Sequence, residues 1–66
     1  MLVVNGKPLD LKPMPETVHE LLEQLKLRHR RLIVEKNKKI VNSSHYDTDP
    51  LSSGDRIEIV HFVGGG

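Results

Sequence analysis

Apolar and polar positions follow two different periods along this chain, and the changes of period predict its elements. Residues 1–4 are apolar and β-prone, and Leu9-Asp10-Leu11 alternates like a short return strand. Asn5-Gly6 between them is typical of a two-residue hairpin turn, because both positions tolerate a positive φ. The chain is therefore expected to begin with a β-hairpin.

A helical period follows the hairpin. Thr17 and Glu20 have the spacing of a capping box, in which the first is the N-cap and the second lies three residues later. Lys26 and Arg28 come near the expected helix end, where positive charge complements the helix dipole. One apolar stripe with helical spacing is formed by Val18, Leu21, Leu22 and Leu25.

The second half of the chain returns to the strand period. Strands are predicted at residues 32–35, 39–41 and 56–62, with turns at Asn37-Lys38 and Gly54-Asp55 and a polar connection over residues 42–53. One helical stripe needs one apolar sheet face to cover it, and Leu32, Val34, Ile57 and Ile59 are expected to supply it. The fold class is therefore α+β of the β-grasp, or ubiquitin-like, type: a mixed sheet of four to five strands packed on one helix. The pattern does not fix the strand order.

Composition narrows the classes of function. Sixty-six residues allow one domain with a small core. The absence of Cys excludes a disulfide, a thiolate metal site and an internal sulfur nucleophile. A net charge of +1 argues against a general nucleic-acid binder. The first residues lack the apolar run of a signal peptide, and no stretch has transmembrane length, so a cytoplasmic protein is expected.

The last three residues, Gly64, Gly65 and Gly66, directly follow the final predicted strand. Glycine has no Cβ, so such a tail is conformationally loose and passes through a channel too narrow for other residues. Its tip presents a free α-carboxylate, which no internal glycine has. We therefore predict a single domain over residues 1–63 and a flexible tail over residues 64–66. This arrangement is typical of a carrier whose terminus enters the active sites of other proteins.

The run from Asp55 to Gly66 resembles the C-terminus of the ThiS family of sulfur carriers. Three further stretches are similar to that family at matching positions: Val4-Asn5-Gly6-Lys7, Thr17-Val18-His19-Glu20-Leu21-Leu22 and Val34-Glu35-Lys36-Asn37. The resemblance covers essentially the whole chain. Its departures are the basic stretch from Lys26 to Arg31 and the serines after Asn42. A terminal diglycine alone is shared with ubiquitin and with MoaD, the molybdopterin sulfur carrier.

The resemblance implies a sulfur carrier of thiamine biosynthesis that is a co-substrate of partner enzymes rather than an enzyme. A ThiF-type enzyme would use ATP to adenylate Gly66, a sulfur donor protein would convert it to a thiocarboxylate, and a ThiG-type thiazole synthase would accept the sulfur. The chain has no phosphate-binding Gly loop followed by Lys, so no bound cofactor is expected and ATP is held by the partner. A MoaD-like carrier, a ubiquitin-like protein modifier and a noncatalytic interaction module stay as alternatives.

Partner binding is expected on the last strand. Ile57 and Ile59 fall on one face of it, and Val60 and Phe62 on the other. Since a single helix covers only one sheet face, the second pair is expected to be exposed and to dock partners together with Val63. A twist near the strand end would instead turn Phe62 into the core. The four His residues are scattered along the chain, so no metal site is predicted.

Overall fold

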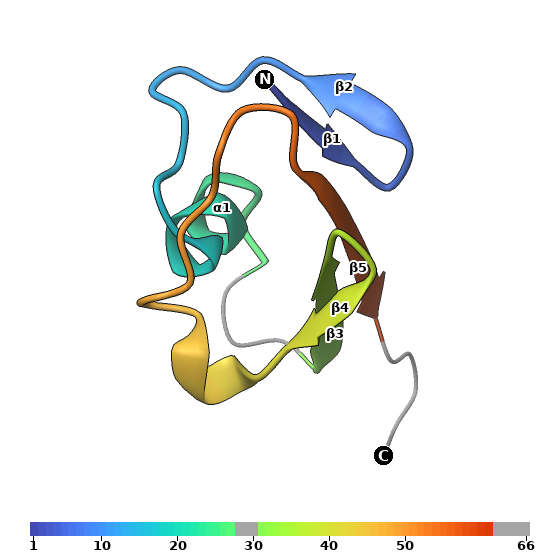
Figure 1. Ribbon diagram of the computed structural model, residues 1–66. Coiled ribbons are helices and arrows are strands. Elements are labelled where there is room, and N and C mark those ends of the chain that lie inside the picture. Colours follow the sequence, from blue (N-terminus) through green and yellow to red (C-terminus); the bar gives the residue numbers. More distant parts are fainter. Residues whose placement is uncertain (28–30, 62–66) are drawn as a thin grey trace.

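The computed structural model describes residues 1–27 and 31–61. Its elements are β1 (Leu2–Val4), β2 (Lys7–Leu9), α1 (Val18–Gln24), β3 (Leu32–Lys36), β4 (Lys39–Val41), the 3₁₀ turn η1 (Ser43–His45) and β5 (Arg56–His61). The five strands form one mixed sheet in the order β2-β1-β5-β3-β4 (Figure 1). Only β1 and β5 run parallel to each other. The last strand thus lies beside the first, which confirms the β-grasp arrangement.

The return strand of the first hairpin lies two residues earlier than the sequence pattern indicated. Asn5 and Gly6 have φ of 51° and 81°, so the turn has two residues and Lys7 pairs directly with Val4. Because β1 has only three residues, β2 ends at Leu9. The predicted return strand at Leu9–Leu11 is therefore wrong at both ends. Leu9 is the last residue of β2 that pairs with β1, and the alternating pattern of Leu9, Asp10 and Leu11 continues past it.

Helix α1 begins and ends at identifiable hydrogen bonds. The Thr17 hydroxyl accepts from the Glu20 N–H at 3.2 Å, as the capping box predicts. At the other end Lys26 has a φ of 61°, and the Leu27 N–H donates to the Leu22 carbonyl at 2.8 Å. This is a Schellman ending with Lys where Gly is usual. Lys26 therefore lies just past the helix, and Arg28 lies outside the described residues.

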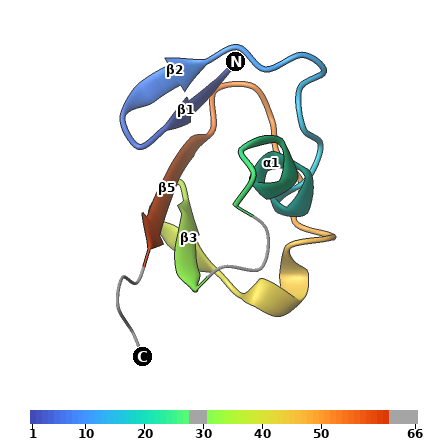
Figure 2. The same cartoon turned by 180° about the vertical axis from the view of Figure 1, so that it is seen from behind.

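The core lies between α1 and one face of the sheet (Figure 2). Of the residues expected there, Leu25 and Leu32 are only partly buried at its margin. The buried apolar residues are Leu2, Val4, Val18, Leu21, Leu22, Val34, Val41, Leu51, Ile57 and Ile59. The predicted match between the helical stripe and the sheet face is thus confirmed at its centre.

The connection over residues 42–55 is polar in sequence but firmly attached to the core. The backbone N–H of His19 donates to the Tyr46 carbonyl at 2.8 Å, and that of Leu51 donates to the Glu16 carbonyl at 2.9 Å. Burial raises the pKa of the Tyr46 phenol above its usual 10.0. This segment therefore closes the end of the core. Within residues 1–27 and 31–61, no helix has the length and apolar character needed to cross a membrane.

Candidate functional site

The sheet face that α1 does not cover carries an apolar cluster, which we call the open-face cluster: Ile33, Ile40 and Val60. Each is the neighbour in sequence of a residue buried on the covered face, so its side chain points the other way. Ile33 pairs directly with Val60 across β3 and β5. Val60 is 53% exposed and Ile40 is 70% exposed. The predicted exposure of Val60 is therefore confirmed.

Two carboxylates lie beside this cluster. Glu35 and Glu58 occupy directly opposite positions on β3 and β5, and Glu35 also pairs with Ile40 on β4. Like charges in opposite positions repel each other and destabilise a sheet. Across residues 1–27 and 31–61, no Lys or Arg nitrogen lies within ion-pair distance of either carboxylate. The open face thus combines apolar side chains with two carboxylates in opposite positions, and Arg56 lies two residues from Glu58 on the same face.

Strand β5 connects this face to the candidate carrier terminus. Ile57 and Ile59 are 1% and 7% exposed and anchor the strand in the core, while Val60 and His61 are exposed. The remaining predicted site residues, Phe62, Val63, Gly64, Gly65 and Gly66, lie outside the described residues. The structure therefore places one of the predicted partner-binding residues, Val60, on the open face. The boundary between a domain at 1–63 and a tail at 64–66 stays a prediction.

Sequence analysis missed Ile33, Ile40 and the opposed carboxylates as parts of this face. The signal was present in the alternation, because Ile33 precedes buried Val34 and Ile40 precedes buried Val41. What the alternation lacked was the pairing of β3 with β5, which brings Ile33 beside Val60. Cross-strand neighbours depend on register, and a one-residue slip would move the side chains to the other face.

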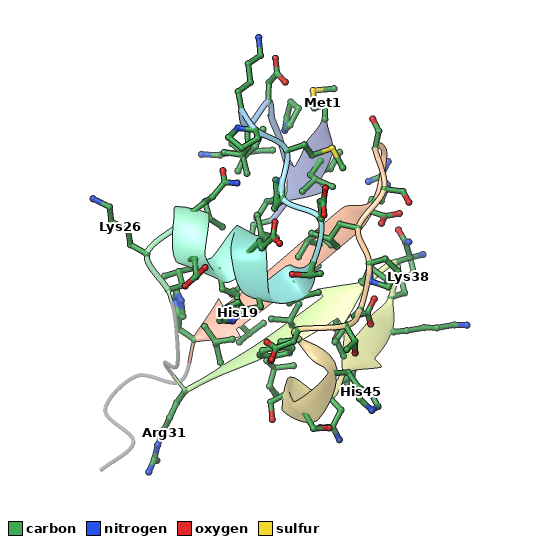
Figure 3. The ribbon with its side chains drawn as sticks, turned by 90° about the vertical axis from the view of Figure 1, so that its left-hand side faces the viewer. Met1, His19, Lys26, Arg31, Lys38 and His45 are labelled. Atoms are coloured by element: carbon green, nitrogen blue, oxygen red, sulfur yellow. The ribbon has the colours of Figure 1, made fainter. Side chains whose placement is uncertain are left out.

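The imidazoles belong to separate elements. His19 lies on α1 and His45 on η1 (Figure 3). The His19 ring lies between two carboxylates, with Nε2 3.5 Å from Glu23 and Nδ1 3.6 Å from Asp47. This contact joins the helix to the connection after η1. Within residues 1–27 and 31–61, no three His, Cys, Asp or Glu residues gather where they would hold a metal ion.

A shallow pocket beside the β3–β4 hairpin contains a structural ion pair. Lys36 forms a salt bridge with Asp49, and its ammonium also donates to the Pro50 carbonyl at 2.8 Å. The pair is only about a fifth exposed, at 23% and 22%. Since Lys36 already has two oxygen partners, it fastens the connection to the sheet rather than offering a free cation. The pocket is lined by Lys36, Asn37, Lys39, Ile40, Val41 and Asp49.

A family model, related sequences and a solved structure each match nearly the whole chain. The ThiS family model matches residues 2–66. The sulfur carrier protein ThiS of Bacillus subtilis (strain 168) is 44% identical over 66 residues, which cover all of both chains. A thiazole synthase of Paramagnetospirillum magneticum is 40% identical over 65 residues, or 98% of this chain but 20% of that protein. The crystal structure of a thiamine biosynthesis protein (ThiS) from Geobacter metallireducens superimposes with a TM-score of 0.83 at 34% identity, covering 98% of this chain and 97% of that one.

Proposed function

The chain belongs to the ThiS family, and from that premise we propose that Gly66 is the residue that is activated and loaded with sulfur. The protein is a sulfur carrier of thiamine biosynthesis, a small carrier rather than an enzyme. The observation that supports this most is the match over all 66 residues to a sulfur carrier, since it includes the terminal glycines. We propose further that the carrier acts in the cytoplasm.

The proposed chemistry begins with a carboxylate that resists attack. A terminal carboxyl group with a pKa near about 3.5 is ionised at neutral pH, and an ionised carboxylate is a poor electrophile. One carboxylate oxygen of Gly66 attacks the α-phosphorus of ATP, which forms an acyl-adenylate and releases pyrophosphate. Hydrosulfide (HS⁻) delivered by a donor protein then attacks the carbonyl carbon, the bond between that carbon and the adenylate oxygen breaks so that AMP leaves, and the S–H proton is lost to solvent. The product is a thiocarboxylate.

Partner proteins supply the ATP site, the sulfur and the enzyme that accepts it. A ThiF-type adenylating enzyme holds the ATP, and since the chain has no Cys the sulfur comes from outside it, in this proposal from a donor protein. A ThiG-type thiazole synthase then accepts the sulfur. The similarity between this chain and part of a thiazole synthase supports a shared pathway of carrier and synthase. Gly64 and Gly65 thread the terminus into each active site because they have no side chain.

We place the docking of the adenylating enzyme on the open face. Val60 is exposed and belongs to the strand that leads to the terminus, and Ile33 and Ile40 enlarge the apolar surface around it. Phe62 and Val63 follow on the same segment of chain and complete the proposed contact. Exposed apolar side chains beside a reactive end are typical of binding surfaces.

The activation step is tested by pyrophosphate exchange with a ThiF-type enzyme, followed by intact-mass measurement after sulfur transfer. Amidation of the Gly66 carboxylate should abolish exchange, because the attacking oxygen is lost. Deletion of Gly66 leaves a carboxylate on Gly65 but withdraws it by about 3.5 Å, which exceeds the tolerance of a reacting geometry. Full exchange by the amidated protein, or sulfur on any other residue, would refute the proposal.

Substitutions at Gly65 test the threading of the tail separately. Gly65→Val should slow activation by narrowing the passage, while Gly65→Ala adds a single methyl group and serves as the graded control. The last described strand ends at His61, four residues before Gly65, so both variants should keep the urea midpoint of the wild type. An unchanged rate with Gly65→Val would mean that the passage is wide enough for a branched side chain.

A further inference from the structure

Strand β5 is held by neighbours on both sides over only part of its length. On one side, β1 ends at Val4, which pairs with Ile57. On the other side, β3 continues as far as Leu32, which pairs with His61. The chain must leave β1 at this point because the hairpin turn begins at Asn5. The last residues of β5 would therefore lose their β1-side partners unless another group replaced them.

Asn5 is that group. Its backbone N–H donates to the Ile57 carbonyl at 2.8 Å, and its side-chain Oδ1 accepts from the Ile59 N–H at 2.7 Å. The side-chain amide thus takes the place of the main-chain carbonyl that a longer β1 would provide. In the part of the chain that the structure describes, no hydrogen bond from the first hairpin reaches β5 beyond Ile59.

We propose that Asn5 is a positioning residue. By bonding to Ile59 it fixes the last residue of β5 that has neighbours on both sides, and so sets the direction in which the chain leaves the sheet toward the activating enzyme. The proposal rests on the function proposed above, because it concerns the delivery of Gly66. Seven residues lead from Ile59 to Gly66 and five from His61 to Gly66. A shift of the last fixed point changes both the length and the direction of the segment that carries the carboxylate.

The second hairpin contains a matched residue at the other end of β5. Asn37 has a φ of 52°, against 51° for Asn5, and also lies first in a two-residue turn. Its N–H donates to the Arg56 carbonyl at 2.7 Å and its Oδ1 accepts from the Arg56 N–H at 3.0 Å. Its Nδ2 also donates to Asp55 Oδ1 at 3.1 Å. Two asparagines of nearly equal φ therefore bond to β5, Asn37 at its first residue and Asn5 at Ile57 and Ile59.

Glycine substitution isolates the side-chain bond. Asn5→Gly keeps the positive φ available and removes the side chain with its acceptor, whereas Asn5→Asp keeps an acceptor oxygen at the same place. An unpaired N–H at Ile59 is costly because the bond is partly buried. The end of β5 should therefore open more often. If only the closed form docks productively, the apparent KM for the carrier rises by the inverse of the closed fraction while kcat stays unchanged.

The experiment uses the full chain with Asn5→Gly, Asn5→Asp and the control Asn37→Gly. Amide hydrogen exchange followed by NMR reports the opening of each strand end, and pyrophosphate exchange with a ThiF-type enzyme gives KM and kcat. Asn5→Gly should accelerate exchange at Ile59 by about fivefold or more relative to Val34. Its KM should rise by the factor by which exchange shows the closed fraction to have fallen, at an unchanged kcat. Asn5→Asp should restore both values.

Asn37→Gly separates positioning from general stability. It should accelerate amide exchange at Arg56 and leave KM within about twofold of the wild type, because the strand end near the terminus stays held. Equal KM changes in both Gly variants, or a closed fraction that falls in Asn5→Gly without the matching rise in KM, would overturn the proposal. If the wild-type protein supports no pyrophosphate exchange, the proposed function fails. Amide exchange then still decides whether Asn5 holds the strand end.

Discussion

The two faces of the sheet are built from alternate residues of the same strands, yet they differ in almost every physical property. The covered face packs Val34, Ile57 and Ile59 against α1, and each is at most 7% exposed. The open face carries the exposed Val60 and Glu58 and, opposite them on β3, the half-buried Ile33 and Glu35. Adjacent residues on one strand thus lie in the core beneath α1 and on a sheet face that no other element covers. The covered face supplies most of the folding stability. Residues of the open face can therefore vary with the proposed docking partner at little cost in stability.

The largest effect is expected on the covered face. Leu22 is 3% exposed, so Leu22→Ala removes buried methyl groups and leaves a cavity beneath α1. The free energy of unfolding should fall by about 2–5 kcal/mol, a large share of the stability of so small a domain. Urea unfolding followed by circular dichroism measures this loss. An unchanged midpoint would show that α1 does not carry the core.

A matched pair of valines compares the faces directly. Val34→Ala on the covered face should cost about 2 kcal/mol, whereas Val60→Ala on the open face should change stability by no more than about 0.5 kcal/mol. For binding to the adenylating enzyme, Val60→Ala should have the larger effect and Val34→Ala the smaller. Titration calorimetry measures this affinity. Val60→Ala should weaken that binding because it removes exposed apolar contact area. Unchanged affinity in this folded variant would remove Val60 from the interface.

The smallest effect concerns the opposed carboxylates. Glu58→Gln removes the repulsion with Glu35 and should raise the free energy of unfolding by about 0.3 kcal/mol at low salt. Added salt should erase the gain, because it screens exposed charges. Glu16→Gln, at an exposed site outside the sheet, serves as the control. A loss of stability in Glu58→Gln would mean that the carboxylate has an attractive partner.

Much of the fold was readable from short stretches of sequence. The turns at Asn5-Gly6 and Asn37-Lys38, the Thr17 cap and the exposure of Val60 all follow from residues close together in the chain. The error at the return strand has a physical cause. The alternation indicated which residues favour a strand, but the length of β1 decided how many of them found partners.

The sequence by itself determined the local elements, the face on which each side chain lies and the resemblance that leads to Gly66. Only the tertiary structure decided that Ile33 lies beside Val60, that Glu35 opposes Glu58 and that the Asn5 side chain reaches Ile59, 54 residues away in sequence. The reason is that turns, caps and alternation depend on interactions between near neighbours. Strand order and register depend instead on how distant segments bury their apolar faces together.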